Sequence, residues 1–416
     1  MTILRSGSTV VLVAAAALMG AGCSDFLKVE NPNTVTASDV NPTSDATTLA
    51  ASALQDFAAS YGTYTVFGGI FTGELYSADV NSGGNLMSVR LVDNTMTDNY
   101  LGSMSKARVL ASKVIAALDG TSQEKSVNSA KAWMVAGYSF LSLAEYFCSA
   151  TVSGGPLLNT QMMLDSAVAT FTKAIDIGGT VGGADASQIK NAALVGRARA
   201  ELWAGNKAAA IADANAVSAG FNYNLVFIND LTNITRLGNY VWHITFNIST
   251  LSAAPAFRNL TDPRVTTVPP SVNKLRPMDG ITDMWSIGKY QSYSAPIRLA
   301  SKIEADYVAA EAQGTAAMLA LINARRAANN QPAYTGGTDA HSVLVEFLVQ
   351  RTYEFYVEGK RMGDYRRYPD DLPFLTPAGT PYRKPNVPAY SNGKCWPISI
   401  QELTNNPNLK GQQGGG

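Results

Sequence analysis

The segment AALVGRARAELWAGNKAAAIADANAV, residues 192–217, constrains the fold more than any other part of the chain. Helix-forming residues fill both of its halves, and Gly205-Asn206 between them is a stop and turn signal. Two such helices bury their facing sides only against a neighbouring pair, as the helices of tetratricopeptide units do. The segment therefore predicts a stack of helix pairs. Four small residues would let the two helices approach closely: Ala193, Ala198, Ala208 and Ala212.

Apolar stripes at helical spacing predict more helices on both sides of this segment. In KAWMVAGYSFLSLAEYF, residues 131–147, apolar residues recur every three or four positions. Another pair begins at Leu299, with residues 318–327 as its partner helix. We expect a mainly α-helical scaffold over about 105–220 and 295–368.

Two other parts of the chain depart from this helical pattern: the first is loop-heavy and aromatic, and the second is poor in helix formers and rich in aromatic, β-branched and proline residues. They cover about 61–104 and 220–295. Within the second, FNYNLVF (221–227) and YVWHITFNI (240–248) predict short strands. Long irregular segments on a helical frame are usually functional, so we expect a loop-rich lobe with a few short strands.

The N-terminus predicts secretion and lipid attachment. Residues 1–22 contain Arg5, a short apolar run and then small residues, which is the pattern of a signal peptide. Because Cys23 follows directly, we expect it to be the acylated first residue of a lipoprotein, with 23–45 as a polar spacer. The alternative is an ordinary secreted protein in which Cys23 is buried or paired.

Two further cysteines would then lie outside the reducing cytoplasm. Cys148 and Cys395 can pair there and tie the middle of the chain to its C-terminal end. They can equally be two buried free thiols, and the sequence leaves both possibilities open.

Composition excludes several classes of function. The chain has 32 basic and 32 acidic residues, so it lacks the electrostatic footprint of a nucleic-acid-binding protein. Its two histidines, His243 and His341, are far apart and have no metal-ligand spacing. We expect no metal and no cofactor.

Charged residues recur on one face of a helix predicted over 344–364. Two carboxylates on this face are compatible with a glycosidase, but each has an arginine three positions away. Arginine partners keep a carboxylate ionised, whereas an acid catalyst needs a raised pKa. We therefore expect a structural ion-pair network and no enzyme. The network comprises Arg351, Glu354, Glu358, Arg361 and Asp364.

Aromatic rings beside polar groups are the chemistry that binds sugars, because a ring packs on the C–H face of a sugar. Two segments have it, YGTYTVFGGIFTGELYSADVN (61–81) and MWSIGKYQSY (284–293). The alternative is that these rings fill the core beneath long loops. Trp285 is the best single candidate, because it lies among small and polar residues. The full set of ligand-binding candidates is Trp285, Tyr290, Tyr293, Tyr61, Tyr64, Tyr76, Asp79 and Asn81.

Six segments, in this order, are similar to segments of one known family. They are CSDFLKVENPN (23–33), AWMVAGYSFLSLAEYFCSATVSGGPLL (132–158), Asp262-Pro263-Arg264, IRLASKIEADYVAAEA (297–312), LVQRTYEFYVEGKRMGDYRRY (348–368) and WPISIQELTNNPNLKGQ (396–412). Over nearly its whole length the chain resembles the SusD/RagB family of nutrient-binding outer-membrane lipoproteins.

The resemblance implies a fold, a location and partners. The fold would be a SusD-like α/α superhelix of four tetratricopeptide-like helix pairs supporting a looped lobe, with 46–416 as one domain. The protein would be anchored to the outer membrane, facing the cell surface, capture an oligosaccharide or other nutrient, and pass it to a SusC-like TonB-dependent β-barrel transporter. A different class of function remains open, a lipid-anchored helical-repeat scaffold whose partner is only protein.

Overall fold

A computed structural model describes residue 41 and residues 44–410. Backbone contacts separate residues 1–45 from a second unit that begins at Ala46, and this second unit contains every element named below. The expected signal peptide, 1–22, and the expected lipid attachment site, Cys23, lie outside the described residues.

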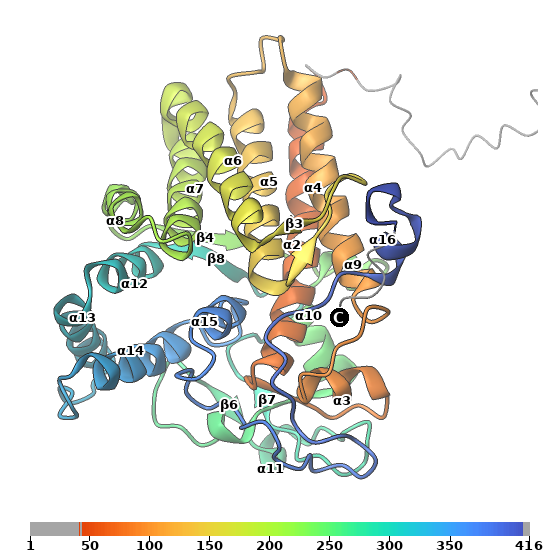
Figure 1. Cartoon of the computed structure of the whole chain (residues 1–416), viewed down its shortest axis with the longest axis vertical. Coiled ribbons are helices and arrows are strands. Elements are labelled where there is room, and N and C mark those ends of the chain that lie inside the picture. The colour runs from red at the N-terminus through yellow and green to blue at the C-terminus, as the bar shows by residue number, and fades with distance from the viewer. Residues whose placement is uncertain (1–40, 42–43, 411–416) are drawn as a thin grey trace, which may run out of the picture. The chain divides into compact units, whose positions relative to one another are not determined.

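Helices that each pack on the next form the scaffold, and Figure 1 shows them as a continuous stack. A long helix, α2, packs against the first two of them. The fold of the protein is mainly α-helical, as the sequence predicted. The helices are α2 (Ala46–Phe71), α4 (Asp98–Leu118), α5 (Val127–Tyr146), α6 (Thr160–Val181), α7 (Gly183–Trp203), α8 (Lys207–Ala216), α12 (Lys302–Gln313), α13 (Thr315–Ala328) and α14 (Ala340–Glu354).

One long insertion interrupts the stack without breaking it. Residues 217–301 lie between α8 and α12 in the chain, yet these two helices pack directly on each other. The insertion can return to its starting point because its two ends pair as antiparallel strands, β4 (Asn222–Leu225) and β8 (Ile297–Ser301). The insertion is therefore a lobe carried on the scaffold.

Three segments make up this loop lobe, which we define as residues 72–97, 217–301 and 368–399. Most of its elements are a single turn or a two-stranded ribbon. The elements of the first two segments are β1 (Leu75–Ser77), α3 (Ser82–Ser88), α9 (Ile234–Leu237), α10 (Tyr240–Trp242), a π-helix (His243–Asn247), β5 (Leu251–Ala253), a 3₁₀ turn (Pro255–Phe257), β6 (Thr267–Val268), α11 (Pro270–Asn273) and β7 (Ser286–Ile287). Outside the lobe lie β2 (Ser149–Ala150), β3 (Leu158–Asn159), α15 (Arg361–Arg367), α16 (Ile400–Asn405) and a 3₁₀ turn (Pro407–Leu409).

Small residues do bring the scaffold helices close together, as the sequence indicated. Phe171 of α6 lies between glycines of its two neighbours, and a Cβ added at Gly137 would lie 2.6 Å from its ring. One added at Gly196 would lie closer still. On α8 the buried positions are Ala210, Asp213 and Ala214. The prediction that Ala208 and Ala212 form this contact is wrong, because α8 presents the opposite face and leaves both exposed.

Three predicted secondary-structure assignments are also wrong. Residues 61–71 continue α2 and are not a loop. The expected strand at 240–248 is α10 followed by a π-helix, because the chain turns around the buried Asn239 side chain, which caps it. The start of the expected helix at Leu299 is strand β8, because β4 supplies its hydrogen-bond partners.

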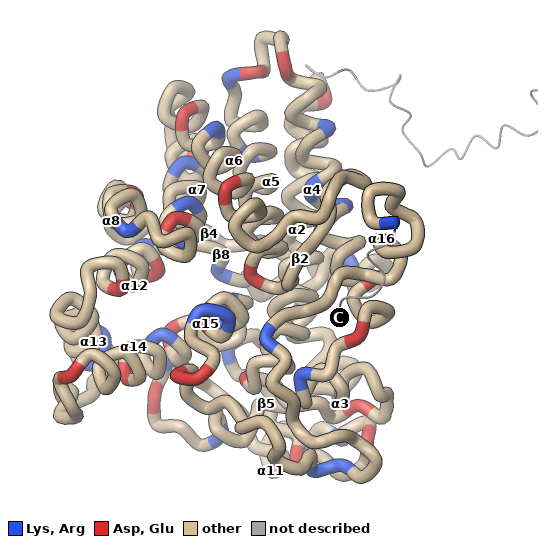
Figure 2. The backbone as a smooth tube through the Cα atoms, viewed as in Figure 1, with Lys and Arg blue, Asp and Glu red and all other residues tan. Residues whose placement is uncertain are grey.

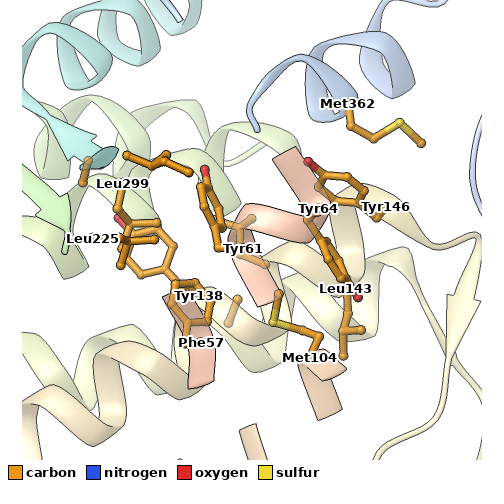
Figure 3. Packing of buried hydrophobic residues seen from close by; sticks show 14 of the residues in the cluster. Phe57, Tyr61, Tyr64, Met104, Tyr138, Leu143, Tyr146, Leu225, Leu299 and Met362 are labelled. Atoms are coloured by element: carbon orange, nitrogen blue, oxygen red, sulfur yellow. The ribbon is translucent and has the colours of Figure 1, made fainter. Parts of the chain in front are cut away.

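Aromatic rings form the junction between α2 and α5 (Figure 3). Phe57 packs on Tyr138 with ring centroids 6.2 Å apart, and Tyr64 packs on Tyr146 at 4.7 Å. These four rings are almost completely buried. They belong to the main core, which joins the first scaffold helices to the lobe.

The helix predicted over 344–364 is broken. It ends at Glu354, and α15 begins at Arg361 in a new direction, because Val357 and Gly359 between them adopt positive φ angles of 49° and 74°. The five charged residues therefore do not share a helix face. Arg351 and Asp364 still pair across the break, at 2.8 Å.

The other members of the predicted network find different partners. Glu358 binds Lys289 at 2.6 Å and Arg298 at 3.0 Å. Glu354 binds Arg264, Arg298 and Arg325, all at 3.7 Å or less. Arg361 instead donates to the carbonyls of Thr72 and Pro373 and to the Thr352 hydroxyl. The expectation that Glu358 neutralises Arg361 is wrong, because the break turns the two side chains to different neighbours.

The C-terminal segment is fastened to the end of α5. Cys148 and Cys395 form a disulfide, and the adjacent backbone bonds join Cys148 to Trp396 and Trp396 to Tyr146. The Trp396 ring is fully buried among the aromatic residues of α2, α4 and α5. Among the described helices, none is both long and apolar enough to cross a membrane.

Two buried carboxyl groups, those of Glu74 and Glu358, have pKa values shifted in opposite directions. Burial raises the pKa of Glu74 to about 7, because Arg361 and the Val357 amide only partly offset the loss of water. Burial also acts to raise the pKa of Glu358, but Lys289 and Arg298 outweigh it and hold the pKa below its ordinary value.

We expect Glu358→Gln and Glu74→Gln to change stability with opposite signs. A lowered carboxyl pKa contributes stability above the unfolded-state pKa, so Glu358→Gln should cost roughly 3 kcal/mol at pH 7, and the cost should shrink as the pH falls below about 4.5. A raised carboxyl pKa costs stability as the pH rises from 4.5 to about 7, so Glu74→Gln should be the more stable protein at about pH 8. Urea unfolding at about pH 4 and about pH 8 measures both effects. The same pH trend in the two variants would contradict the assignment.

The disulfide should contribute to stability because it closes a long loop. The two cysteines are 247 positions apart, and a crosslink of that span restricts the unfolded chain strongly. Replacing both by serine is expected to lower the free energy of unfolding by about 2–4 kcal/mol, measured by denaturant unfolding. The unchanged protein in reducing buffer is the control and should behave as the double variant does. Unchanged unfolding midpoints in both would show that the bond adds nothing.

Candidate functional site

The three segments of the loop lobe meet around one cavity of about 340 Å³. Its walls combine rings, guanidinium groups and short apolar side chains. The first segment contributes Tyr76 and Arg90, the third contributes Phe374, Arg383 and Tyr390, and residues 254–256 of the insertion complete the wall. We call this cavity the lobe cleft.

Strand pairing places Tyr76 in the cleft. In β1, Leu75 and Ser77 are buried and Tyr76 between them faces outward, because successive side chains of a strand point to opposite sides. The antiparallel partner β5 sets Tyr76 opposite Ser252. The ring is therefore half-buried at the wall.

Arginine side chains hold the Tyr76 ring in place. The guanidinium carbon of Arg383 lies 4.1 Å from the ring centroid, and that of Arg258 lies 5.8 Å from it. Arg383 also donates to the Ser77 carbonyl, next to Tyr76 in the chain. Cation–π contacts of this kind orient a ring and leave its free area for a ligand.

A second arginine–tyrosine pair, Arg90 and Tyr390, also lines the cleft. Arg90 lies 5.3 Å from the centroid of the Tyr390 ring. Its Nε donates to the Ser391 carbonyl at 2.9 Å and its Nη2 to the Thr376 carbonyl at 2.8 Å. Arg90 thereby joins the first lobe segment to the third, although they are about 290 positions apart in the chain.

The cleft keeps its charges over the whole neutral pH range. Burial raises the pKa values of Tyr76 and Tyr390, so both phenols stay neutral. Burial lowers the pKa values of Arg90 and Arg258, but arginine remains protonated. The cleft therefore offers neutral rings and fixed positive charges.

Trp285 lies beside the cleft, not in its wall. Its ring is half-buried and its centroid lies 5.8 Å from the guanidinium carbon of Arg258, which is also 5.8 Å from the centroid of the Tyr76 ring. The backbone N–H of Trp285 donates to the Ser252 hydroxyl at 2.9 Å. The structure thus brings together two of the rings selected from the sequence.

Three other sequence candidates lie elsewhere on the lobe. The hydroxyl of Tyr293 is 3.3 Å from His243 Nδ1, on the π-helix. Asp79 and Asn81 bond to each other, with the Asn81 amide groups donating to Asp79 at 3.0 Å. They sit at the start of α3 and do not line the cleft.

The prediction that Tyr61, Tyr64 and Tyr290 contact a ligand is wrong. All three are at most 3 % exposed, and their hydroxyls donate to backbone carbonyls inside the protein. Two of these carbonyls belong to the break between α14 and α15. The rings are therefore core residues, which is the alternative that the sequence left open.

The sequence reasoning missed most of the residues that line the cleft. Of the lining residues, Arg90, Arg383, Phe374 and Tyr390 were not selected, and neither was Arg258, which contacts Tyr76 from outside the lining. One signal was available in PAGTPYRKPNVPAY, residues 377–390, which combines four prolines with two tyrosines, as 220–295 combines prolines with aromatic residues. The arginines gave no comparable signal.

Other sites are less suited to a ligand. A larger cavity of about 490 Å³ lies against α2, α7 and β4, but one aromatic residue, Tyr223, is present in its described lining. Among the described residues, no group of three or more histidine, cysteine or acidic side chains is placed to hold a metal.

Comparison with known proteins gives matches of structure only. No known family profile matches the sequence, and no curated protein is similar to it in sequence. The solved structures with this fold include a laminarin-binding SusD-like protein, 15% identical, with a TM-score of 0.69 and coverage of 86% of this chain and 97% of that chain. A chitin-binding SusD homolog from Flavobacterium johnsoniae is 14% identical, with a TM-score of 0.62 and coverage of 86% and 94%.

A third example comes from a protein named only by its family. A SusD/RagB family protein from Bacteroides thetaiotaomicron is 13% identical, with a TM-score of 0.65 and coverage of 88% of this chain and 95% of that chain. Identities this low show the fold. The chain has the SusD-like fold, which confirms the fold that the sequence resemblance predicted.

Proposed function

We propose that this protein binds a glycan at the cell surface, as a lipoprotein anchored through Cys23, and delivers it to a SusC-like TonB-dependent transporter. The lobe cleft is the observation that carries the proposal. It places the rings of Tyr76 and Tyr390 and the guanidinium groups of Arg90 and Arg383 around one cavity of ligand size. Similar folds in solved structures include proteins that bind laminarin and chitin.

The cleft has the chemistry that sugars require. A sugar ring presents C–H groups that pack on an aromatic face, and its hydroxyls accept hydrogen bonds from guanidinium N–H groups. The volume of about 340 Å³ is near the lower end of the range for small-molecule sites, so the cleft would hold a short part of a glycan.

The anchor and the transporter rest on the sequence. The signal pattern of 1–22 and the position of Cys23 support lipid attachment, and the family resemblance supports the transporter partner. One feature of the insertion fits a protein contact: Val226, Ile228 and Leu231 are 67%, 51% and 80% exposed. A protein-only scaffold, the alternative function, would use the same surface without a ligand in the cleft.

Tyr76→Ala is expected to weaken glycan binding by roughly three- to tenfold, because it removes the ring at the cleft wall. Trp285→Ala should have a smaller effect, since Trp285 does not line the cleft. Affinity electrophoresis on a panel of neutral and acidic polysaccharides would measure both, with thermal unfolding to separate lost binding from lost folding. Trp133→Ala, a half-buried ring on α5, is the control. Loss of binding in this control equal to that in Tyr76→Ala would remove the cleft as the site.

A pull-down of the full-length tagged protein in mild detergent is expected to recover a large β-barrel protein in stoichiometric amount. Cys23→Ala should move the protein from the membrane fraction to the soluble fraction and reduce this recovery. Mass spectrometry of the captured proteins and immunoblots of the fractions provide the measurement. Recovery of other proteins without a barrel, in detergent that preserves comparable complexes, would favour the scaffold function.

A further inference from the structure

The charged residues in the wall of the lobe cleft are all cationic. Arg90 and Arg383 line the cavity, and no carboxylate from the described part of the chain does so. This is a local property, because acidic and basic residues are interspersed over the rest of the described chain (Figure 2) and are equal in number over the whole sequence.

Arg90 is buried without a counter-ion. It is 4% exposed, and within the described chain no carboxylate lies within salt-bridge distance of its guanidinium. Its partners are the carbonyls of Ser391 and Thr376 and the face of Tyr390, which carry only partial negative charge. Burial lowers the pKa of Arg90, and only tyrosines oppose it. Buried charges in proteins are normally paired with an opposite charge, and Arg90 has no such counter-ion among the described residues.

Arg90 is also held in a strained backbone conformation. Its φ angle is +60°, in the left-handed region that residues other than glycine seldom adopt. The Ser391 hydroxyl donates to its carbonyl at 2.7 Å and holds it there. Strain that is maintained by surrounding contacts is common at ligand sites.

Arg383 shares the carboxylate of Asp279 with Lys384. The carboxylate of Asp279 is 3.6 Å from Arg383 but 2.7 Å from Lys384. It also accepts the Thr282 hydroxyl and the amides of Ile281 and Thr282. The Nε of Arg383 is buried and has no hydrogen-bond partner among the described residues. The Asp279 carboxylate thus already has a full set of hydrogen-bond partners other than Arg383.

Arg258 adds a third guanidinium near Tyr76, 5.8 Å from the ring centroid and outside the cleft lining. It donates to the carbonyls of Ala253 and Asp283 and to the Ser252 hydroxyl. In the described chain it has no carboxylate within salt-bridge distance, and the exposed side chain of Asp283 acts on it only at longer range. Two guanidinium groups, those of Arg383 and Arg258, therefore lie within 6 Å of the Tyr76 ring centroid.

We propose that the cleft selects an acidic saccharide, whose carboxylate or sulfate group binds Arg90 and Arg383 while a sugar ring packs on Tyr76 or Tyr390. This inference rests on the proposed glycan-binding function and specifies its ligand class. A guanidinium group matches both anions, because its N–H groups form two parallel hydrogen bonds to a pair of oxygens. The anion would supply the counter-charge that Arg90 lacks.

Matched pairs of oligosaccharides test the charge directly. The first pair is an oligogalacturonide and its neutral methyl ester, and the second is a sulfated galactan oligosaccharide and its desulfated form. With the full-length protein in detergent, calorimetry should show at least about tenfold tighter binding to the acidic member of one pair. The pair that shows the preference distinguishes carboxylate from sulfate. Raising NaCl from about 20 mM to about 500 mM should weaken binding of the acidic oligosaccharide several-fold and leave binding of the neutral one unchanged.

Variants locate the effect. Arg383→Gln, on a half-buried side chain, should lose about tenfold in affinity for the acidic probe and keep its affinity for the neutral one, and Arg383→Lys should lose less. Arg90→Gln should do the same, with circular dichroism to confirm folding because Arg90 is buried. Arg276→Gln, an exposed arginine of the same lobe that does not line the cleft, is the matched control and should bind as the unchanged protein does.

The outcomes separate this inference from the proposed function. Neutral and acidic probes bound equally, without salt dependence, would overturn the acidic-saccharide inference and leave glycan binding intact. An acidic preference that survives in both arginine variants would place the anion outside the cleft and overturn the inference too. Failure to bind any saccharide, on this panel and on the polysaccharide panel, would overturn the proposed function itself.

Discussion

Three consecutive backbone carbonyls, those of Val357, Glu358 and Gly359, determine how the scaffold and the lobe are joined. The chain breaks its helical course there, so no helical amides are available to them, and a buried carbonyl without a partner costs about as much as a lost hydrogen bond. Tyrosine hydroxyls replace the amides at 2.8–3.0 Å, one from the lobe insertion, one from α2 and one from α5. One short turn thus connects three distant parts of the chain.

The position of the cleft depends on this turn. A Cβ at Gly359 would lie 2.8 Å from the Thr65 hydroxyl, so the turn tolerates no side chain there. Val357 holds a positive φ angle, which is rare for a β-branched residue and is maintained only because its amide and its carbonyl are both bonded. The turn sends α15 back onto α2 and α5. From there the following loop reaches the lobe and delivers Arg383 and Tyr390 to the cleft.

Local patterns predicted the elements that local physics decides. The stop signal at Gly205-Asn206 separates α7 from α8, and the apolar stripe of 131–147 corresponds to α5. Strand β8 was not predicted, because its partner β4 lies in a distant part of the chain. The ligand candidates show the same limit, since a sequence displays the ring of Tyr61 but not the carbonyl that its hydroxyl reaches. Arg90 and Arg383 left no local trace, because only the folded chain brings them to the same cavity.

The disulfide between Cys148 and Cys395 has a consequence for the response of the chain to proteases. Both ends of the loop lobe's longest insertion, and the whole stack from α6 to α15, lie between the two cysteines. A protease that cuts one exposed loop in that span leaves two fragments that remain covalently joined. The damaged chain therefore keeps its parts together, and nicking becomes visible on a gel only after the bond is reduced.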